Sequence, residues 1–285
     1  MEQTYLTQLN PAQQKAALWP NGSVLVLAGA GSGKTKVLTS RIAWLMREQG
    51  IKASAIMAVT FTNKAAKEMN LRLTAMLSVQ NKGMWMGTFH GLCHRLLRAH
   101  ASEAGLPKEF QILDIQDQQS LVKRLQKSLQ INDERYPTKQ MVNLFNKLKE
   151  EGLRSSAALG LGATEQALYK AYEQQCQKDG VVDFAELLLR SVDLLNQQPL
   201  LREHYQNRFE HILVDEFQDT NPLQYAWLKL LSGSQTHVLA VGDDDQSIYG
   251  FRGALVRHMQ DFQRDFSVLE VIKLEQNYRS HGHIL

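Results

Sequence analysis

The sequence predicts an α/β fold in which a parallel sheet is interrupted by an all-helical subdomain. Short apolar runs alternate with segments of helical periodicity, which is typical of a parallel sheet with helical crossovers. A glycine-rich segment joins the first apolar run to the first helical segment. Between about residues 110 and 205 the pattern is helical, and we expect no strand there.

Continuous apolar runs mark the expected strands, because strands buried on both faces of a parallel sheet lack alternation. The first such run is Ser23 to Ala28. Further strand-like runs are 55–61 (AIMAVTF), 84–89 (MWMGTF), 211–216 (HILVDE), 237–243 (HVLAVGD) and 271–277 (VIKLEQN). After the glycine-rich segment, Leu38, Ile42, Leu45 and Met46 share one face of an expected helix. Gly50 is a suitable stop for that helix.

Apolar residues in the middle of the chain fall at helical spacing. They include Leu121, Val122, Leu125, Leu129, Val142, Leu144, Phe145, Leu148, Phe184, Leu187, Leu188, Val192 and Leu195. The basic residues of these helices could contact a polyanion, although a solvated helix face explains each one taken alone. These residues are Lys123, Arg124, Lys127, Lys147 and Lys149. We expect a helical subdomain inserted between two strands of the sheet.

Composition sets broad limits on function. With 44% hydrophobic and 21% charged residues, the 285-residue chain has an ordinary globular composition, which argues against intrinsic disorder. The net charge of +3 excludes only a strongly acidic protein. Cys93 and Cys176 are too few and too far apart for a disulfide framework or a metal cluster. No signal-peptide pattern and no apolar run of membrane-spanning length occurs, so we expect a soluble, cytoplasmic protein.

Residues 28–35, AGAGSGKT, form the expected phosphate-binding loop between a strand and a helix. Its glycines allow backbone N–H groups to curl around phosphate oxygens, and the helix N-terminus adds partial positive charge. Lys34 can reach the β- and γ-phosphates, and the Thr35 hydroxyl can ligate Mg²⁺. Ala28 stands where the usual pattern has its first glycine. The alternative, a chance glycine-rich turn, is disfavoured by the strand and helix that flank the loop.

Asp215 and Glu216 follow the apolar strand of HILVDE. Two adjacent carboxylates at the end of a buried strand are costly without a metal and a chemical role. We expect Asp215 to hold Mg²⁺, and Glu216 to orient and deprotonate the attacking water. Together with the phosphate loop these residues indicate ATP hydrolysis, and on these motifs alone a kinase or a transporter ATPase stays possible.

Further motifs carry a family resemblance that runs from about residue 5 to residue 285. They are LNPAQ (9–13), TFTNKAA (60–66), GTFH (87–90), VDEFQDT (214–220), VGDDDQSIYGFRGA (241–254) and LEQNYRS (274–280). In this order and spacing they resemble the superfamily 1 DNA helicases of the UvrD/Rep/PcrA group. That family tolerates alanine at the first position of the loop. The resemblance implies a RecA-like P-loop NTPase domain that uses ATP and Mg²⁺.

The resemblance also implies roles in nucleotide binding. Gln13 matches a glutamine that recognises adenine, Gln246 matches one that senses the γ-phosphate, and Arg279 matches an arginine that stabilises transition-state charge. Arg41 is a weaker candidate for facing the nucleotide. The predicted catalytic residues are Lys34, Asp215, Glu216, Gln246 and Arg279. The predicted ATP-binding residues are Gln13, Ala28, Gly29, Ala30, Gly31, Ser32, Gly33, Lys34, Thr35, Lys36 and Arg41, with Thr35 and Asp215 as metal ligands.

Single-stranded DNA is held by base stacking on aromatic side chains and by contacts to the backbone. By the resemblance, Phe61 and Phe251 match stacking positions, and Tyr249 bridges the nucleotide and DNA sites. Core packing is the alternative for either phenylalanine taken alone. The remaining predicted DNA contacts are Asn63, Thr88, His90 and Arg252. The partners implied are single-stranded DNA, junctions of single- and double-stranded DNA, and repair proteins, without a membrane.

The family architecture implies two RecA-like domains with ATP between them, moving 3′ to 5′ on DNA. We expect 1–108 and 206–285 to form the first of these domains, 109–205 to form the helical insertion, and the second domain to be absent. Such an N-terminal fragment is expected to bind ATP and Mg²⁺ weakly and not to unwind DNA. The alternatives are the motor of a RecB/AddA-type helicase-nuclease, or an ATP-dependent DNA-binding scaffold that is not a motor. The oligomeric state and the repair pathway stay open.

Overall fold

The computed structural model describes residues 4–20, 22–77, 83–158, 160–243 and 260–276. The chain divides into two compact units. The first comprises Met1–Phe89, Leu200–Thr220 and Leu228–Leu285, and the second comprises His90–Pro199 and Asn221–Trp227. The predicted site residues Gln246, Tyr249, Phe251, Arg252 and Arg279 lie outside the described residues.

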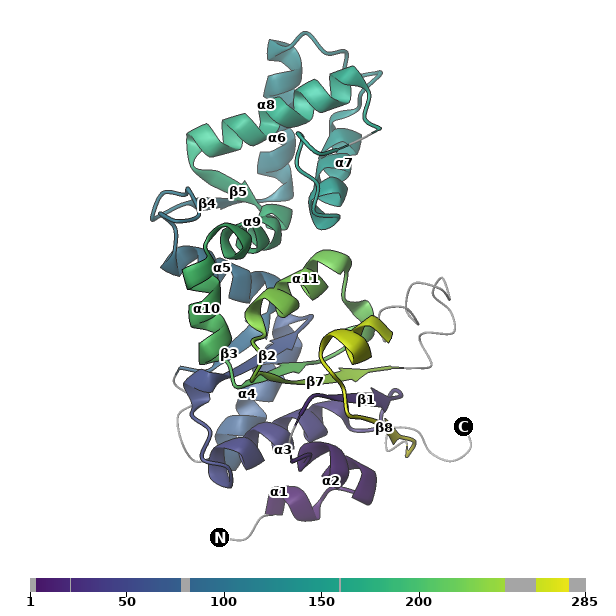
Figure 1. Cartoon of the computed structure of the whole chain (residues 1–285). Coiled ribbons are helices and arrows are strands. Elements are labelled where there is room, and N and C mark those ends of the chain that lie inside the picture. Colours follow the sequence, from purple (N-terminus) through teal and green to yellow (C-terminus); the bar gives the residue numbers. More distant parts are fainter. Residues whose placement is uncertain (1–3, 21, 78–82, 159, 244–259, 277–285) are drawn as a thin grey trace, which may run out of the picture. The chain divides into compact units, whose positions relative to one another are not determined.

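A 6-stranded parallel sheet in the order β3-β2-β6-β7-β1-β8 forms the centre of the first unit (Figure 1). Its strands are β1 (Val24–Ala28), β2 (Ile56–Thr60), β3 (Trp85–Thr88), β6 (His211–Val214), β7 (His237–Gly242) and β8 (Glu270–Leu274). Five of these strands lie within a run predicted to form one, and β8 overlaps the predicted run 271–277 but begins one residue earlier, at Glu270. The strand predictions are confirmed in this sense. Because all the strands are parallel, their carboxyl ends meet at one edge of the sheet.

Helices cover both faces of this sheet (Figure 1). One face carries α1 (Thr4–Thr7), α2 (Pro11–Ala17), α3 (Lys34–Arg47) and α4 (Asn63–Leu77), and the other carries α10 (Pro199–Arg208). The division between the units falls within α11 (Pro222–Leu231). Two 3₁₀ turns, η1 (Ala53–Ala55) and η2 (Phe217–Asp219), precede β2 and follow β6. Residues 260–265 are helical.

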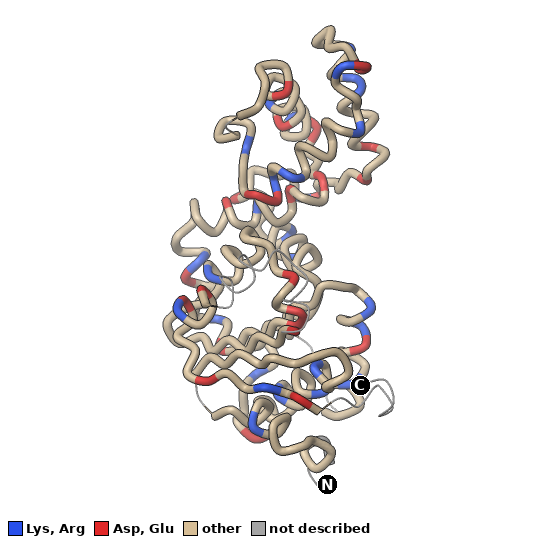
Figure 2. The backbone as a smooth tube through the Cα atoms, turned by 90° about the vertical axis from the view of Figure 1, so that its right-hand side faces the viewer, with Lys and Arg blue, Asp and Glu red and all other residues tan. Residues whose placement is uncertain are grey.

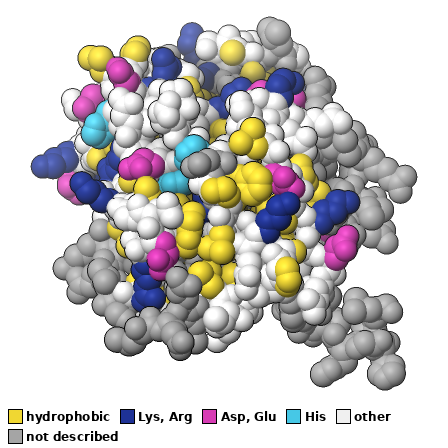
Figure 3. Space-filling model, turned by 60° about the horizontal axis from the view of Figure 1, so that its bottom comes forward, with side chains coloured by type: hydrophobic (Ala, Val, Ile, Leu, Met, Phe, Trp, Pro, Cys, Tyr) yellow, Lys and Arg dark blue, Asp and Glu magenta, His cyan; other side chains and the backbone are white. Residues whose placement is uncertain are grey.

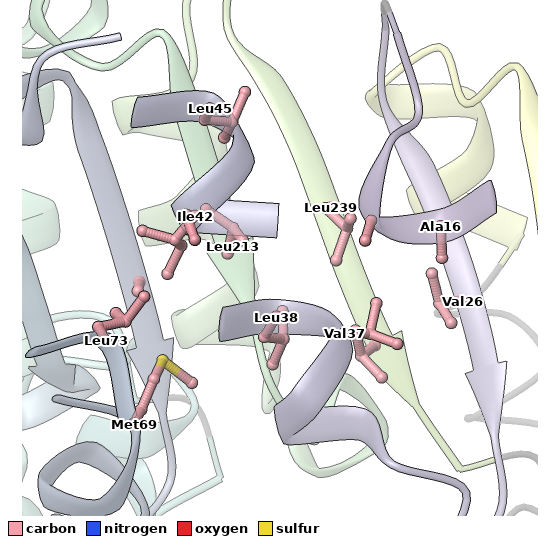
Figure 4. Packing of buried hydrophobic residues seen from close by; sticks show 14 of the residues in the cluster. Ala16, Val26, Val37, Leu38, Ile42, Leu45, Met69, Leu73, Leu213 and Leu239 are labelled. Atoms are coloured by element: carbon pink, nitrogen blue, oxygen red, sulfur yellow. The ribbon is translucent and has the colours of Figure 1, made fainter. Parts of the chain in front are cut away.

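The core of the first unit forms where α3 lies on the sheet. Figure 4 shows Val37, Leu38, Ile42 and Leu45 of α3 among the side chains of the neighbouring strands and helices. The predicted apolar face of this helix is confirmed, because Leu38, Ile42 and Leu45 are buried, and Met46 is partly buried against the same cluster. The helix ends at Arg47, and Gly50 follows with φ 67°, a left-handed conformation that favours glycine. This packing holds the N-terminus of α3 next to the carboxyl end of β1.

The second unit is built mainly from helices. They are α5 (Phe89–Ala99), α6 (Ile115–Ser128), α7 (Thr138–Glu150), α8 (Ala163–Asp179) and α9 (Phe184–Gln197). Phe145 stacks on Tyr169 at 4.7 Å and on Tyr172 at 5.5 Å in the core of this unit. Burial of these aromatic rings stabilises the packing of α7 against α8.

The expectation of no strand between residues 110 and 205 is wrong. The second unit contains a 2-stranded parallel sheet of β4 (Gln111–Leu113) and β5 (Val181–Asp183). Each strand has three residues, which is too short for a periodic apolar signal. Each leads into a helix whose N-cap aspartate, Asp114 or Asp183, accepts a hydrogen bond from the third helical N–H.

Two other expectations for the second unit are corrected. Lys149 is expected on an exposed helix face, either solvated or in contact with a polyanion, but it is buried against carboxylates. Phe184 falls at helical spacing with the apolar residues of its helix, but its side chain is 59% exposed. Phe184 is the first residue of α9, where the strand joins the helix, and its ring stacks on His90 although helical spacing groups it with Leu187 and Leu188.

The surface carries charges of both signs. In Figure 2, basic and acidic residues alternate along the tube in both units and form no single block. On the face in Figure 3, hydrophobic side chains lie among scattered charged side chains and histidines. In the described part of the chain, no helix combines the length and apolarity that crossing a membrane requires.

Candidate functional site

The glycine-rich loop connects β1 to α3 with backbone conformations that require glycine. Gly31 and Gly33 have φ values of 79° and 90°. A Cβ atom at Gly33 would lie 2.6 Å from Gln13 Nε2, so a side chain there would be strained and would clash. The backbone N–H and the hydroxyl of Ser32 both donate to Gly29 O, at 3.2 and 2.8 Å, and tighten the turn. The loop thus turns directly into the N-terminus of α3, a position suited to phosphate.

Ala28 is the last residue of β1 and is fully buried. It pairs with Leu274 in the register between β1 and β8. The alanine that replaces the usual glycine therefore lies within the strand, and its methyl group packs into the core. The glycines with left-handed conformations, Gly31 and Gly33, follow it in the loop.

Lys34 lies between two carboxylates from neighbouring strand ends. Its Nζ is 2.6 Å from Glu216 Oε2 and 3.8 Å from Asp243 Oδ2. The three side chains come from the start of α3 and from the ends of β6 and β7. The parallel sheet therefore brings together residues that are about 180 and 210 positions apart in the sequence.

Asp215 and Glu216 differ in environment although they are adjacent. Asp215 is buried, and its backbone N–H donates to Val59 O at 2.9 Å. Burial and the neighbouring Glu216 carboxylate raise the pKa of Asp215 to about 6. The positive charge of Lys34 acts in the opposite direction and is outweighed. Glu216 is partly exposed and has φ 48°, a left-handed conformation that costs roughly 1 kcal/mol outside glycine. Such strain at a strand end is typical of functional sites.

Gln13 is buried, and both ends of its amide are engaged. Its Oε1 accepts from the backbone N–H of Asn10 at 3.0 Å, completing a capping box for α2. Its Nε2 donates to Ser32 O at 2.8 Å. Gln13 therefore joins the start of α2 to the phosphate loop, and its recognition of adenine stays a prediction.

A pocket of about 740 Å³ opens over the loop. Predicted residues that line it are Gln13, Ala30, Gly31, Gly33, Lys34, Thr35, Lys36 and Glu216. The pocket adds Glu68, Arg72 and Asp243, which the sequence analysis missed. The signal for Asp243 was its position as the last residue of the predicted strand run 237–243. Glu68 and Arg72 form an ion pair of 2.6 Å one helical turn apart, and no motif marked them.

Arg41 lies elsewhere in the first unit. It is buried, and its guanidinium donates to Ala17 O at 3.2 Å and to Trp19 O. It also lies 4.8 Å from the centroid of the Trp44 ring. Burial lowers the pKa of Arg41 to about 10. Arg41 is not one of the described residues that line the pocket over the loop.

Phe61, Asn63 and Thr88 come together at the carboxyl edge of the sheet. Thr60 of β2 is in register with Thr88 of β3, so Phe61 and Asn63 follow the strand next to Thr88. The Phe61 ring meets the Phe89 ring edge-on at 5.3 Å and is partly exposed. Asn63 is exposed. A partly exposed ring beside polar side chains offers a face to a ligand.

In the second unit, His90 stacks on Phe184 with ring centroids 4.0 Å apart and an interplanar angle of 20°. Burial lowers the pKa of His90. Phe184 is largely exposed, and sequence reasoning did not select it. The sequence offered one signal for this position: a large apolar residue directly follows Asp183, which caps the helix.

The sequence model described as UvrD/REP helicase N-terminal domain matches residues 9–267. The chain is 52% identical over 290 aligned positions to DNA helicase II of Escherichia coli (strain K12), with 100% of the chain covered. It is 50% identical to DNA helicase II of Haemophilus influenzae, with 98% covered. It is 39% identical to ATP-dependent DNA helicase PcrA of Staphylococcus aureus (strain Mu50), also with 98% covered. The chain spans about 40% of the length of these relatives.

Proposed function

The chain belongs to the UvrD/REP helicase N-terminal domain family, and on this basis we propose that it is the ATP-binding part of an ATP-dependent 3′–5′ DNA helicase. The observation that carries the proposal is the Lys34 ammonium, held between Glu216 and Asp243 beside the glycine loop. A cation and two carboxylates at the start of a helix and the ends of two parallel strands form the apparatus that phosphoryl transfer needs.

The described residues fit ATP and Mg²⁺. The left-handed glycines leave the loop open to phosphate, and the pocket is large enough for a nucleotide. Thr35 and Asp215 would hold Mg²⁺, which when bound supplies charge neutralisation at the phosphates. Lys34 would pair with the phosphates, and Glu216 would accept the proton of the attacking water. Gln246 and Arg279 are proposed to contact the γ-phosphate, Gln13 the adenine, and Lys36 the nucleotide more loosely. Arg41 is not part of this proposal, because its guanidinium donates to Ala17 O and Trp19 O and does not line the pocket.

We also propose that the protein binds single-stranded DNA. In the first unit, the ring of Phe61 would stack on a base while Asn63 and Thr88 contact the backbone. In the second unit, the stacked pair of His90 and Phe184 presents an exposed ring of the same kind. Tyr249, Phe251 and Arg252 complete the proposed DNA contacts. Junction binding, repair or replication partners and a cytoplasmic location are further parts of the proposal.

We propose the predicted domain division as well. Residues 1–108 and 206–285 would form the ATP-binding RecA-like domain, and 109–205 would form the helical insertion.

The decisive experiment is Lys34→Ala in the intact protein that carries this chain. ATP hydrolysis should fall by roughly 10³-fold or more, because the phosphates lose their main protein cation. Binding of a fluorescent single-stranded oligonucleotide without nucleotide should stay within about twofold. The matched control is Lys52→Ala. Lys52 is exposed and lies just before η1, at the amino end of β2, whereas the phosphate loop lies at the carboxyl edge of the sheet. Unchanged ATP hydrolysis in Lys34→Ala would refute the assignment.

A further inference from the structure

Gln218 lies in η2, two residues after Glu216, and its side chain joins two parts of the site. Its Nε2 donates to Glu216 Oε2 at 2.8 Å, and its Oε1 accepts from the backbone N–H of Asp243 at 2.9 Å. We propose that Gln218 is a positioning residue for ATP hydrolysis, which keeps the Glu216 carboxylate in place when Lys34 turns to the phosphates. The inference rests on the proposed function, because it assumes that Glu216 is the general base.

Only a side chain that both donates and accepts can make this bridge. The backbone N–H of Asp243 can only donate, and a carboxylate oxygen of Glu216 accepts. The two partners therefore determine which end of the Gln218 amide faces which group. A glutamate at this position could keep the contact with Asp243 but would turn a second carboxylate toward Glu216. A methionine of similar length could make neither bond.

The bridge matters because Lys34 and Gln218 donate to the same oxygen. Lys34 Nζ lies 2.6 Å and Gln218 Nε2 lies 2.8 Å from Glu216 Oε2. Nucleotide phosphates compete with Glu216 for Lys34, because they carry more negative charge than one carboxylate. When Lys34 moves, the hydrogen bond from Gln218 still holds Glu216. The base then keeps a defined rotamer at the moment when it has to orient a water molecule.

The other end of the amide is anchored to the sheet. Asp243 directly follows β7, and Val214 at the end of the neighbouring β6 is in register with Ala240 of β7. Gly242 makes room for this approach, because a Cβ atom there would lie 3.2 Å from Gln218 Oε1. Gln218 is thus fastened to the backbone of the central sheet by a contact that involves no nucleotide. This anchoring suits a residue that sets the position of another.

The test measures steady-state ATP hydrolysis and equilibrium ATP binding in the intact protein. Gln218→Met should lower kcat by roughly 10- to 100-fold, with KM and the Kd for ATP within about twofold of the wild type. Gln218→Glu should lower kcat at least as much, although it keeps the acceptor for Asp243. The matched control is Gln206→Met, which removes an amide that donates to Leu230 O at 3.0 Å in the same unit. It should leave kcat unchanged.

The outcomes separate this inference from the proposed function. A kcat within twofold of the wild type in either Gln218 variant overturns the positioning role, as does a loss matched by equally weakened ATP binding. If Gln218→Met does not fold, Gln218→Glu, which differs by one atom from the native residue, decides the question. Glu216→Gln serves as the reference. If it hydrolyses ATP at the wild-type rate, the assignment of the base fails, and the role of Gln218 falls with it. If Glu216→Gln is inactive while Gln218→Met is active, only the role of Gln218 fails.

Discussion

At the residue scale, Arg41 and two histidines form a polar cluster at the amino-terminal end of the sheet. His211 of β6 is in register with His237 of β7, and their ring centroids are 5.3 Å apart. Burial, the positive charge of Arg41 and the neighbouring His237 lower the pKa of His211 to about 3. Burial and Arg41 also lower the pKa of His237, against the opposing effect of Glu210. The cluster therefore folds with neutral imidazoles beside a buried guanidinium.

This cluster predicts a loss of stability in acid. The folded pKa of His211 lies below its unfolded value of 6.5, so below that value the unfolded chain binds the proton more readily. The stabilisation that comes from keeping the His211 imidazole neutral is present above pH 6.5 and is lost as the pH drops toward 3. From pH 7 to pH 4 His211 alone should account for about 3 kcal/mol of lost unfolding free energy.

Urea titrations at the two pH values measure this loss. His211→Gln should remove most of its share of the pH dependence, whereas His204→Gln, at an exposed position on α10, should not. An unchanged pH dependence in His211→Gln would show that the imidazole does not stay neutral on folding.

At the scale of elements, a buried ionic network joins three helices of the second unit. Lys149 of α7 is 1% exposed, and its Nζ lies 2.5 Å from Asp183 and 3.0 Å from Glu186 at the start of α9. Tyr172 of α8 donates to Asp183 at 2.8 Å. Burial opposes the charge of Lys149, but the Glu186 and Asp183 carboxylates outweigh it and raise the pKa of Lys149. The network fixes the start of α9, where Phe184 stacks on His90.

Replacing Lys149 by methionine should destabilise the protein by roughly 3 kcal/mol, because removing one partner leaves buried carboxylates without their cation. Lys147→Met is the matched control on the same helix. Lys147 is exposed and lies 3.9 Å from Glu151, so its loss should cost less than about 0.5 kcal/mol. Urea unfolding followed by circular dichroism compares the two. Equal stability of the two variants would contradict a structural role for the network.

At the scale of the whole molecule, the chain spans about 40% of the length of its curated relatives. The residues around Lys34 all lie in the first unit, so one unit supplies the glycine loop, the lysine and both carboxylates. From the family resemblance we predict that the intact protein has a further RecA-like domain that completes the nucleotide site. Transition-state charge would then be stabilised in part by groups outside these 285 residues.

The 285-residue chain alone should therefore bind ATP and turn it over at least about 10²-fold more slowly than the intact protein, since one cationic group from a second domain is worth that much or more. Titration with a fluorescent ATP analogue measures binding, and phosphate release with and without single-stranded DNA measures turnover. Turnover equal to that of the intact protein would mean that this chain carries the complete catalytic apparatus.

Most described strands of the central sheet were predictable from sequence because they are short, largely apolar runs. The edge strand β8 (EVIKL) instead mixes charged and apolar residues. The phosphate loop and the pair of Asp215 and Glu216 were predictable because their chemistry depends on adjacent residues. The short strands β4 and β5 were not predictable, since their three residues carry no periodic signal and form through pairing across about 70 positions. Local patterns also could not reveal the burial of Lys149, the exposure of Phe184, the place of Arg41 or the bridge made by Gln218.

The sequence was sufficient to establish an α/β sheet, its phosphate loop and the acidic strand end, because each depends on contiguous residues. Tertiary structure was needed to bring Lys34, Glu216 and Asp243 together and to show that Gln218 links two strand ends. Those contacts depend on the order of β6, β7 and β1 in the sheet. That order results from packing between distant segments, and no local stretch of sequence contains it.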